Sequence, residues 1–255
     1  MKKRLYNVLR KAGVINTRSD AERLIREVRV KVDGEVIRSL EFQLNPRKRL
    51  ITIDDRLIRS MQKSTYIVMN KPKGYITSKI REQGRKNVMD LIKTDSLITE
   101  EIKKSISPVG RLDMDTEGLI LITNDGKLAH KILQPNHEVE KTYEAMIWGI
   151  LNDEEKKKLE NGIIIELEEN GVITKYKTLS CKIRIINKDK NSCHLEIKIR
   201  EGKKRQIRRM FDKLNHTVME LRRVKIGALS LGKIELGKYR VVPKEEAYKT
   251  IKPQP

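Results

Sequence analysis

The residues Val109-Gly-Arg-Leu-Asp-Met-Asp-Thr-Glu-Gly-Leu-Ile-Leu-Ile-Thr-Asn-Asp-Gly126 join a polar loop directly to an apolar segment. The apolar run Leu119–Ile122 predicts a buried strand. The loop before it holds four charged side chains, Arg111, Asp113, Asp115 and Glu117. A buried strand holds polar groups at its mouth rigidly, and functional sites are usually built there. An Asp-rich turn before a strand can also be only a solvated turn, so this stretch alone leaves both interpretations open.

The chain is strongly basic. Its 255 residues include 56 Lys plus Arg against 35 Asp plus Glu, which gives a formal net charge of +21. The excess is spread along the whole chain. A globular protein this basic usually binds a polyanion. Nucleic acid is the first candidate, and an anionic membrane surface is the second. Only 4% of the residues are aromatic, so we expect phosphate and shape contacts, more than base stacking, to hold RNA.

Other features favour a cytoplasmic protein. No run of about 18 apolar residues is present, which argues against a membrane-spanning helix. The start, Met1-Lys-Lys-Arg-Leu-Tyr6, has no apolar segment typical of a secretory signal. Cys181 and Cys193 form neither a disulfide framework nor a metal cluster, and we expect both to be small packing residues in strands. We expect a monomer that has no membrane partner.

Residues 1–58 predict a small module of two helices and a short sheet. Apolar residues at helical spacing predict the first helix, which Gly13 ends: Leu5, Val8, Leu9 and Ala12. Ser19 with Glu22 predicts a capping box for the second helix. Two short alternating runs around Asp33-Gly34 predict a hairpin, and Ile51–Asp54 predicts a further strand.

The rest of the chain predicts a second, larger domain over residues 63–255. Residues 55–64 lose periodicity, so we place the boundary there. Alternating strands with hairpin-type turns, such as Asn187–Asn191, take the place of regular βαβ units. The expected fold class is therefore α+β with a mixed, mainly antiparallel sheet, and Trp148 is expected in its core.

Four segments of this domain resemble, in order, motifs of the RsuA/RluB/RluF branch of pseudouridine synthases, which act on ribosomal RNA. The segments are Tyr66–Gly74, Val109–Gly126, Lys141–Gly149 and Arg200–Phe211. Residues 223–232 and 236–243 resemble the closing strands of the same family. The front module is similar to the RNA-binding domain first seen in ribosomal small-subunit protein S4, through Arg18–Ile25 and Val30–Gly34. That domain usually has a glycine where this chain has Val28.

The resemblance implies a set of roles. Asp113 would be the catalytic residue, acting on the base or as a stabiliser of the cleaved sugar. Tyr143 would stack on the base and assist proton transfer. Arg208 would enter the site and pair with Asp113, since a buried Asp needs such a partner to stay ionised. Arg111 would take the place of the flipped uridine.

Further residues are expected to contact RNA. The basic side chains assigned to phosphate or RNA are Arg18, Arg23, Arg26, Lys71, Lys73, Arg205 and Arg209. For Lys71 and Lys73 the plain alternative is a solvated turn. Ile226 or Leu229 would line the base pocket, and the sequence does not decide between them.

The implied reaction is an isomerisation of uridine that needs no redox change, so no cofactor and no metal are expected. The implied partner is ribosomal RNA, with the large-subunit RNA slightly favoured. Two alternatives stay open. One is a non-catalytic RNA-binding or ribosome-assembly factor, and the other is the same chemistry on transfer RNA.

Overall fold

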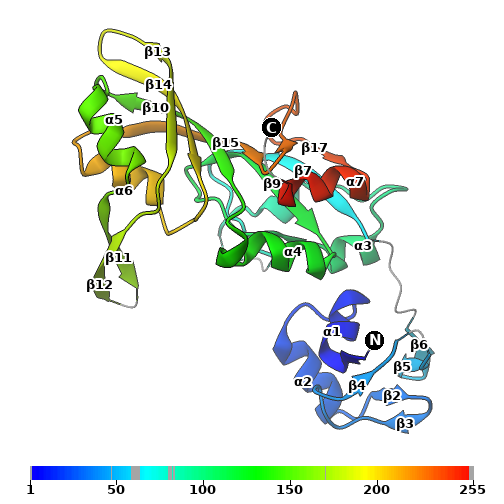
Figure 1. Cartoon of the computed structure of the whole chain (residues 1–255). Helices are drawn as coiled ribbons and strands as arrows, with labels where there is room; N and C mark the ends of the chain where they lie inside the picture. Colours follow the sequence, from blue (N-terminus) through cyan, green and yellow to red (C-terminus); the bar gives the residue numbers. More distant parts are fainter. Residues whose placement is uncertain are drawn as a thin grey trace. The chain divides into compact units, whose positions relative to one another are not determined.

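The computed structural model describes residues 2–46, 48–58, 64–79, 82, 84–169 and 171–252 (Figure 1). The chain forms two compact units. The first comprises Met1–Thr65 with Ile92–Ser107 and Thr123–Asp125, and the second comprises Tyr66–Leu91, Pro108–Ile122 and Gly126–Pro255. Part of the linker, residues 59–63, lies outside the described residues. The domain division between residues 58 and 63 stays a prediction.

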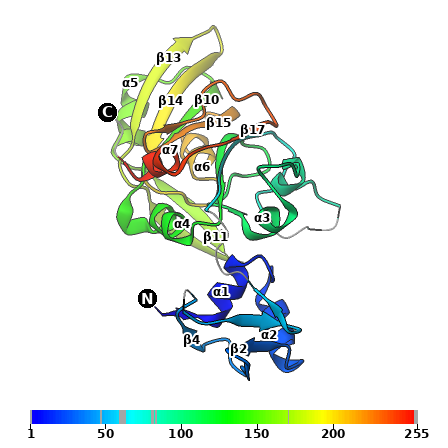
Figure 2. The same ribbon diagram turned by 90° about the vertical axis from the view of Figure 1, so that its right-hand side faces the viewer.

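The first unit pairs two helices with a small sheet (Figures 1 and 2). The helices are α1 (Leu5–Lys11) and α2 (Arg18–Arg26), and α3 (Glu100–Ser105) also belongs to this unit. The sheet has the order β3 (Glu35–Val36), β2 (Val30–Val32), β5 (Ile51–Ile53) and β6 (Arg56–Leu57), and β1 (Lys3–Arg4) pairs separately with β4 (Gln43–Leu44). The predicted apolar face is confirmed, because Leu5, Val8 and Leu9 are buried together with Val30 and Ile51.

The predicted capping box of α2 is wrong by two residues. Thr17 caps the helix: its hydroxyl accepts from the Asp20 backbone N–H at 3.1 Å, and the Asp20 carboxylate accepts from the Thr17 N–H at 2.8 Å. Ser19 and Glu22 have the same spacing as Thr17 and Asp20. Thr17 has the extended backbone that an N-cap needs, whereas Ser19 already lies inside the helix.

Val28 occupies a position that favours glycine. Its φ is +57°, directly after the C-cap of α2, and its N–H donates to the Ile25 carbonyl at 3.1 Å. A left-handed backbone costs a residue with a Cβ roughly 1–2 kcal/mol. The side chain is 39% exposed and packs little.

Val28→Gly is therefore expected to raise the free energy of unfolding by about 0.5–1 kcal/mol, because relief of strain exceeds the entropy that glycine loses on folding. Urea denaturation measures the change. Val36→Gly is the matched control, since Val36 is 38% exposed but lies in strand β3, where glycine should destabilise. Equal losses of stability in both variants would contradict this account of Val28.

The second unit is built on one long sheet with the order β13-β14-β10-β15-β9-β7-β17 (Figure 1). The strands are β7 (Tyr66–Lys71), β9 (Glu117–Thr123), β10 (Lys141–Trp148), β13 (Lys182–Lys188), β14 (Ser192–Ile199), β15 (Val218–Ile226) and β17 (Tyr239–Val241). β16 (Leu229–Ser230) pairs with β15, and the short β8 (Ser107–Pro108) precedes the loop before β9. β9 and β15 run parallel, whereas β10 pairs antiparallel with both β14 and β15. The expected α+β fold with a mixed, mainly antiparallel sheet is confirmed.

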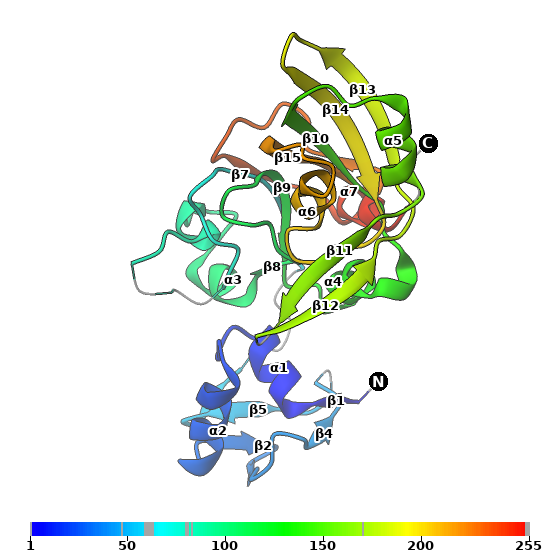
Figure 3. The ribbon, with the colours of Figure 1, turned by 90° about the vertical axis from the view of Figure 1, so that its left-hand side faces the viewer.

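Helices cover the sheet through two apolar clusters. α5 (Asp153–Glu160) and α6 (Gln206–Asp212) pack on β10 and β14 through Leu159, Ile207 and Phe211. α4 (Gly126–Leu133) and α7 (Lys244–Ala247) pack on β7 and β9. Three 3-10 turns complete the unit, η1 (Val88–Leu91), η2 (Pro135–His137) and η3 (Tyr248–Ile251). The hairpin of β11 (Ile164–Glu169) and β12 (Val172–Lys177) lies outside the long sheet, next to α6 (Figure 3).

Two packing predictions have different outcomes. Cys181 and Cys193 are both buried and free, as expected for packing residues. Trp148 is 55% exposed, so its assignment to the core is wrong. Side chains alternate along a strand, and Tyr143, Ala145 and Ile147 occupy the core face of β10. No helix in the described part of the chain is both long and apolar enough to cross a membrane.

Candidate active site

The loop before β9 carries the candidate catalytic residues, and the sheet fixes where it ends. β9 pairs in parallel with β15 at Gly118 and Arg223. Gly118 has φ +104°, and a Cβ placed there would lie 2.2 Å from the Arg223 carbonyl oxygen. Only glycine permits this approach without a backbone shift. The sequence Thr-Glu-Gly therefore brings the loop from Asp113 to Glu117 against β15.

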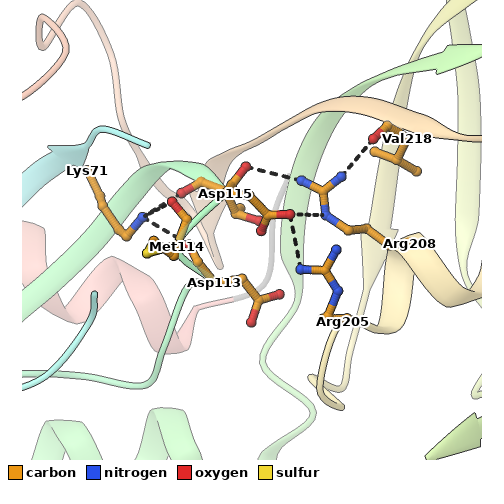
Figure 4. A network of polar contacts seen from close by, with 8 residues as sticks. Lys71, Asp113, Met114, Asp115, Arg205, Arg208 and Val218 are labelled. Atoms are coloured by element: carbon orange, nitrogen blue, oxygen red, sulfur yellow. Dashed lines mark hydrogen bonds and ion pairs between the residues drawn. The ribbon is translucent and has the colours of Figure 1, made fainter. Parts of the chain in front are cut away.

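Lys71 anchors the backbone of this loop from one side. This corrects its assignment as an RNA-facing residue. It is the last residue of β7 and has no exposed surface. Its ammonium group donates to the backbone carbonyl oxygens of Thr116 at 2.8 Å and Asp113 at 2.9 Å (Figure 4). Pro72 O at 3.1 Å and Met114 O at 3.4 Å complete the set. A buried ammonium needs such acceptors, and the loop supplies them.

Burial lowers the pKa of Lys71 to about 8, while the neighbouring carboxylates of Asp115 and Asp113 act in the opposite direction. The pKa of Lys141, at the start of β10, is also lowered to about 8, by burial and then by the nearby Arg223. Two lysines of lowered pKa thus lie in the unit that carries the loop. Such perturbed groups concentrate at functional sites.

Arg208 holds the loop from the other side, and its predicted partner is wrong. Its guanidinium pairs with the Asp115 carboxylate at 3.2 Å and donates to the Asp115 carbonyl oxygen at 3.1 Å. A third contact, to the Val218 carbonyl oxygen at 2.7 Å, ties it to β15. Arg205 pairs with the same Asp115 oxygen at 3.0 Å. Arg205 and Arg208 lie three residues apart at the start of α6, so both side chains reach Asp115, the second aspartate of the loop.

The Asp113 carboxylate is not held by the contacts that fix the rest of the loop. In Figure 4 the ion pairs of Arg205 and Arg208 end on Asp115, and no dashed line reaches the Asp113 carboxylate. Within the described residues, that half-buried carboxylate has no hydrogen bond or ion pair, although the Asp113 backbone oxygen is held by Lys71 and by the Thr116 N–H. A carboxylate on a fixed backbone can act as a nucleophile or stabilise a developing positive charge.

Tyr143 lies across the sheet from the same loop. On β10 it pairs in register with Arg223 of β15, and Arg223 in turn pairs with Gly118 of β9. Tyr143 is 8% exposed and belongs to the apolar cluster that also contains Leu112. The sheet topology therefore places the third segment, Lys141–Gly149, one strand away from the strand that follows the loop.

The remaining predicted residues of the second unit fall into three groups. Arg111, Lys73 and Arg205 are exposed, as an RNA contact requires. Arg209 donates to the Glu166 carbonyl oxygen at 2.6 Å, which places it against the β11–β12 hairpin. Ile226 and Leu229 pair with each other and are 2% and 1% exposed, so both are packed in the core cluster under α4.

Two residues of the site, Asp115 and Arg223, have no role in the sequence-based prediction, and a third, Lys71, is predicted there to face RNA phosphate. Lys71 was misjudged because a lysine before proline is typical of a surface turn. Its position directly after the apolar run Tyr66–Met69 was the available signal. Nothing in the sequence distinguishes Asp115 from the nearby Asp113 as the partner of an arginine. Arg223 is 5% exposed and donates to the Leu119 carbonyl oxygen at 2.8 Å, and nothing in its sequence context marks it as buried.

The fold and the site are those expected of an RNA-modifying enzyme. Comparison with known proteins shows which family the chain belongs to. A family model described as RNA pseudouridylate synthase matches residues 65–213, and one described as S4 domain matches residues 3–50. The chain belongs to the RNA pseudouridylate synthase family and carries an S4 domain, as the resemblance implied. It is an RNA pseudouridine synthase, so the enzyme interpretation is confirmed over the non-catalytic one.

Relatives match along nearly the whole chain. An RNA pseudouridine synthase of Aquifex aeolicus is 37% identical over 253 residues, covering 99% of this chain and 95% of that protein. Ribosomal large subunit pseudouridine synthase B of Bacillus subtilis is 36% identical over 243 residues, covering 95% and 93%. A crystal structure of a pseudouridylate synthase superposes with a TM-score of 0.66 at 29% identity, covering 97% of this chain and 99% of that one.

Arg208→Met is expected to slow modification about tenfold to a hundredfold with little change in RNA affinity, because the loop loses its two contacts to Arg208 and small misplacements of a reacting group are costly. Arg209→Met, the neighbouring variant, removes only the contact to the hairpin and should leave the rate near that of the parent. Single-turnover rates at saturating RNA, with binding measured separately, distinguish the two. A rate defect confined to Arg209→Met would contradict the placement of α6.

Proposed function

We propose that this protein isomerises a specific uridine of ribosomal RNA to pseudouridine, with Asp113 as the catalytic carboxylate. The observation that carries the proposal is the contrast within one loop. Lys71 and Arg208 hold the backbone and Asp115, while the Asp113 carboxylate makes no ion pair with any described residue. A carboxylate on a fixed backbone, with no ion pair of its own, suits a reaction at an electron-poor sugar carbon.

The reaction needs no net gain or loss of atoms. The bond between N1 of the base and C1′ of the sugar breaks, the base rotates, and C5 bonds to C1′. The hydrogen leaves C5 and N1 gains one. Asp113 is proposed to attack or to stabilise the cleaved intermediate, and Tyr143 to stack on the base and assist the proton transfer. Arg208 acts through Asp115, as a positioning residue and not as the direct partner of Asp113.

The target uridine has to leave its stack to reach Asp113. Extrusion costs roughly a few kcal/mol, and less in loops and single strands. Arg111, exposed two residues before Asp113, is proposed to fill the space that the base leaves. Structured loops of ribosomal RNA offer such uridines.

Ribosomal RNA is favoured over transfer RNA by two observations. The Bacillus subtilis relative, named for the large ribosomal subunit, matches over nearly its full length. The S4 domain and the net charge of +21 support a second RNA-binding surface in addition to the catalytic one. We propose the large-subunit RNA as the substrate and a monomer as the active form.

The substrate class is tested with the purified protein and in vitro transcripts of its own ribosomal and transfer RNAs. Uridine labelled with tritium at C5 releases the label when pseudouridine forms. Release from a large-subunit transcript supports the proposal. Release from transfer RNA alone would contradict it and leave the chemistry intact.

The S4 domain is expected to contribute phosphate contacts through α2. Arg23 and Arg26 are exposed on this helix, whereas Arg18 pairs with Glu22 at 3.0 Å and Glu41 at 3.7 Å. Replacing Arg23 and Arg26 by Gln should lower the slope of log affinity against log salt by about 1.4, at about 0.7 for each lost contact on single-stranded sites. Lys157 and Lys158, exposed on α5, give a control with the same loss of charge. Equal slopes in both double variants would show that α2 does not touch the RNA.

A further inference from the structure

One half-buried carboxylate, that of Glu201, joins three segments of the second unit. Glu201 follows β14 and begins the turn that leads to α6. Its carboxylate accepts from the Tyr176 hydroxyl at 2.5 Å and from the Leu179 N–H at 2.8 Å. It also accepts from the Gln206 side-chain amide at 2.6 Å. Tyr176 belongs to β12, Leu179 to the segment after it, and Gln206 is the first residue of α6.

Gln206 links the Glu201 carboxylate to the backbone of the turn before α6. It is 3% exposed, and its side-chain oxygen accepts from the Lys203 backbone N–H at 3.0 Å while its amide donates to Glu201. The Lys203 ammonium lies 4.6 Å from the centre of the Tyr176 ring, a cation–π distance. Every polar group of the Gln206 side chain is thereby used to close the turn from Glu201 to Gln206.

The turn is held in a conformation that needs such support. Arg205, its penultimate residue, has φ +52° and ψ +31°, the left-handed region that a residue with a Cβ rarely adopts. Backbone strain of this kind persists where the surroundings over-determine it. Arg205 and Arg208 are the two residues that reach Asp115. Their approach therefore depends on the path of the strained turn.

The hairpin is fixed to α6 at a second place. Arg209 donates to the Glu166 carbonyl oxygen at 2.6 Å, and the Lys213 ammonium pairs with the Glu166 carboxylate at 2.9 Å. β11–β12 thus contacts both ends of the helix that carries Arg208, through Glu201 at the start and Glu166 further on. Figure 3 shows the hairpin beside α6.

We propose that Glu201 is a positioning residue for the isomerisation: by binding Tyr176, Leu179 and Gln206 it uses the β11–β12 hairpin to hold the strained turn that delivers Arg205 and Arg208 to Asp115. This rests on the proposed function, because Asp115 matters through the loop that carries Asp113. Glu201 contacts no reacting atom and acts on the rate through the arginines that contact Asp115, chiefly Arg208, which makes two contacts to that residue. The Tyr176 hydroxyl stays a donor throughout the neutral range, since its bond to Glu201 raises the pKa of Tyr176 to about 12.

The test is Glu201→Gln in the full chain. The substitution keeps the size of the side chain, but it replaces the carboxylate that accepts from three donors by an amide with a single acceptor oxygen. We expect the single-turnover rate at saturating RNA to fall about tenfold, with the Kd for the same RNA within about threefold of the parent. Hydrogen exchange at the Lys203 amide should become faster. Glu160→Gln is the matched control: its carboxylate accepts one backbone N–H, that of Ile183 at 2.9 Å, and lies outside the turn. A parental rate in Glu201→Gln, or an equal loss in Glu160→Gln, would overturn the proposal.

A double variant separates a positioning role from a general loss of stability. If Glu201 acts through Arg208, Glu201→Gln combined with Arg208→Met should be within about twofold of Arg208→Met alone, since residues in one network are not additive. Losses that multiply would overturn the proposal. Should Glu201→Gln fail to fold, Tyr176→Phe removes one donor only, and about threefold slower turnover at unchanged Kd is expected. A parental rate in Tyr176→Phe would then overturn it.

Asp113→Asn, measured beside these variants, keeps the two proposals distinguishable. If Asp113→Asn is inactive and Glu201→Gln is normal, the positioning role of Glu201 fails and the catalytic assignment stands. If Asp113→Asn is active, the catalytic assignment fails.

Discussion

Asp113→Asn is expected to lose pseudouridine formation by about a thousandfold or more while binding its RNA as tightly as the parent protein. The substitution keeps the size of the side chain and removes only the charge. Lys71 and Thr116 contact the backbone oxygen of Asp113 and not its carboxylate, so the loop should keep its shape. Tritium release from C5-labelled RNA gives the rate, and filter binding gives the affinity.

Asp115→Asn is the informative comparison, because Asp115 is the carboxylate that Arg205 and Arg208 contact. Its amide oxygen can still accept one arginine, so we expect a partial loss, about tenfold, through a looser loop. The opposite pattern, an inactive Asp115→Asn beside an active Asp113→Asn, would assign the chemistry to the paired aspartate.

Lys71→Met is expected to have the largest effect on stability. Methionine fills most of the same volume but leaves the carbonyl oxygens of Asp113 and Thr116 without their ammonium donor. Each buried acceptor that loses its partner costs about 1–3 kcal/mol, so a loss of about 2–5 kcal/mol is expected. Lys73→Met, two residues on at an exposed position, should change stability by less than about 0.5 kcal/mol. Similar losses in both variants would contradict the anchoring role of Lys71.

The same pair of proteins has a defined pH dependence. Burial lowers the pKa of Lys71 to about 8 from its ordinary value of 10.5. Between these values the unfolded chain binds a proton that the folded chain does not, so the contribution of Lys71 to stability rises with pH. The parent should gain stability relative to Lys71→Met from pH 8 to pH 10.5. Lys141 is present in both proteins and cancels. Urea denaturation across this range measures the difference, and a constant gap would argue against a buried ammonium.

Local sequence rules predicted the elements well where the information is local. Helical spacing from Leu5 to Ala12 and the turn residues Asp33-Gly34 act within a few residues, and the structure has the corresponding helix and hairpin. Both turn residues have positive φ, as a two-residue hairpin needs. The order of the strands in the sheet was not predicted: β10, β15 and β9 are neighbours, although β10 lies between β9 and β15 in sequence.

Side-chain partners were beyond those rules. The loop offers Arg208 two possible partners, Asp113 and Asp115. The three-dimensional path of the turn before α6 determines that Arg208 pairs with Asp115. Lys71 has the composition of a surface turn, and its burial follows from the loop that closes over β7. Thr17 and Ser19 fit the same capping pattern, and the backbone entering α2 selects Thr17.

The most direct test of the central claim is to map pseudouridines in ribosomal and transfer RNA from cells that lack this gene. We expect pseudouridine to be lost at one or a few positions of ribosomal RNA, and to be restored by the parent protein but not by Asp113→Asn. An unchanged ribosomal RNA, a loss confined to transfer RNA, or restoration by Asp113→Asn would contradict it.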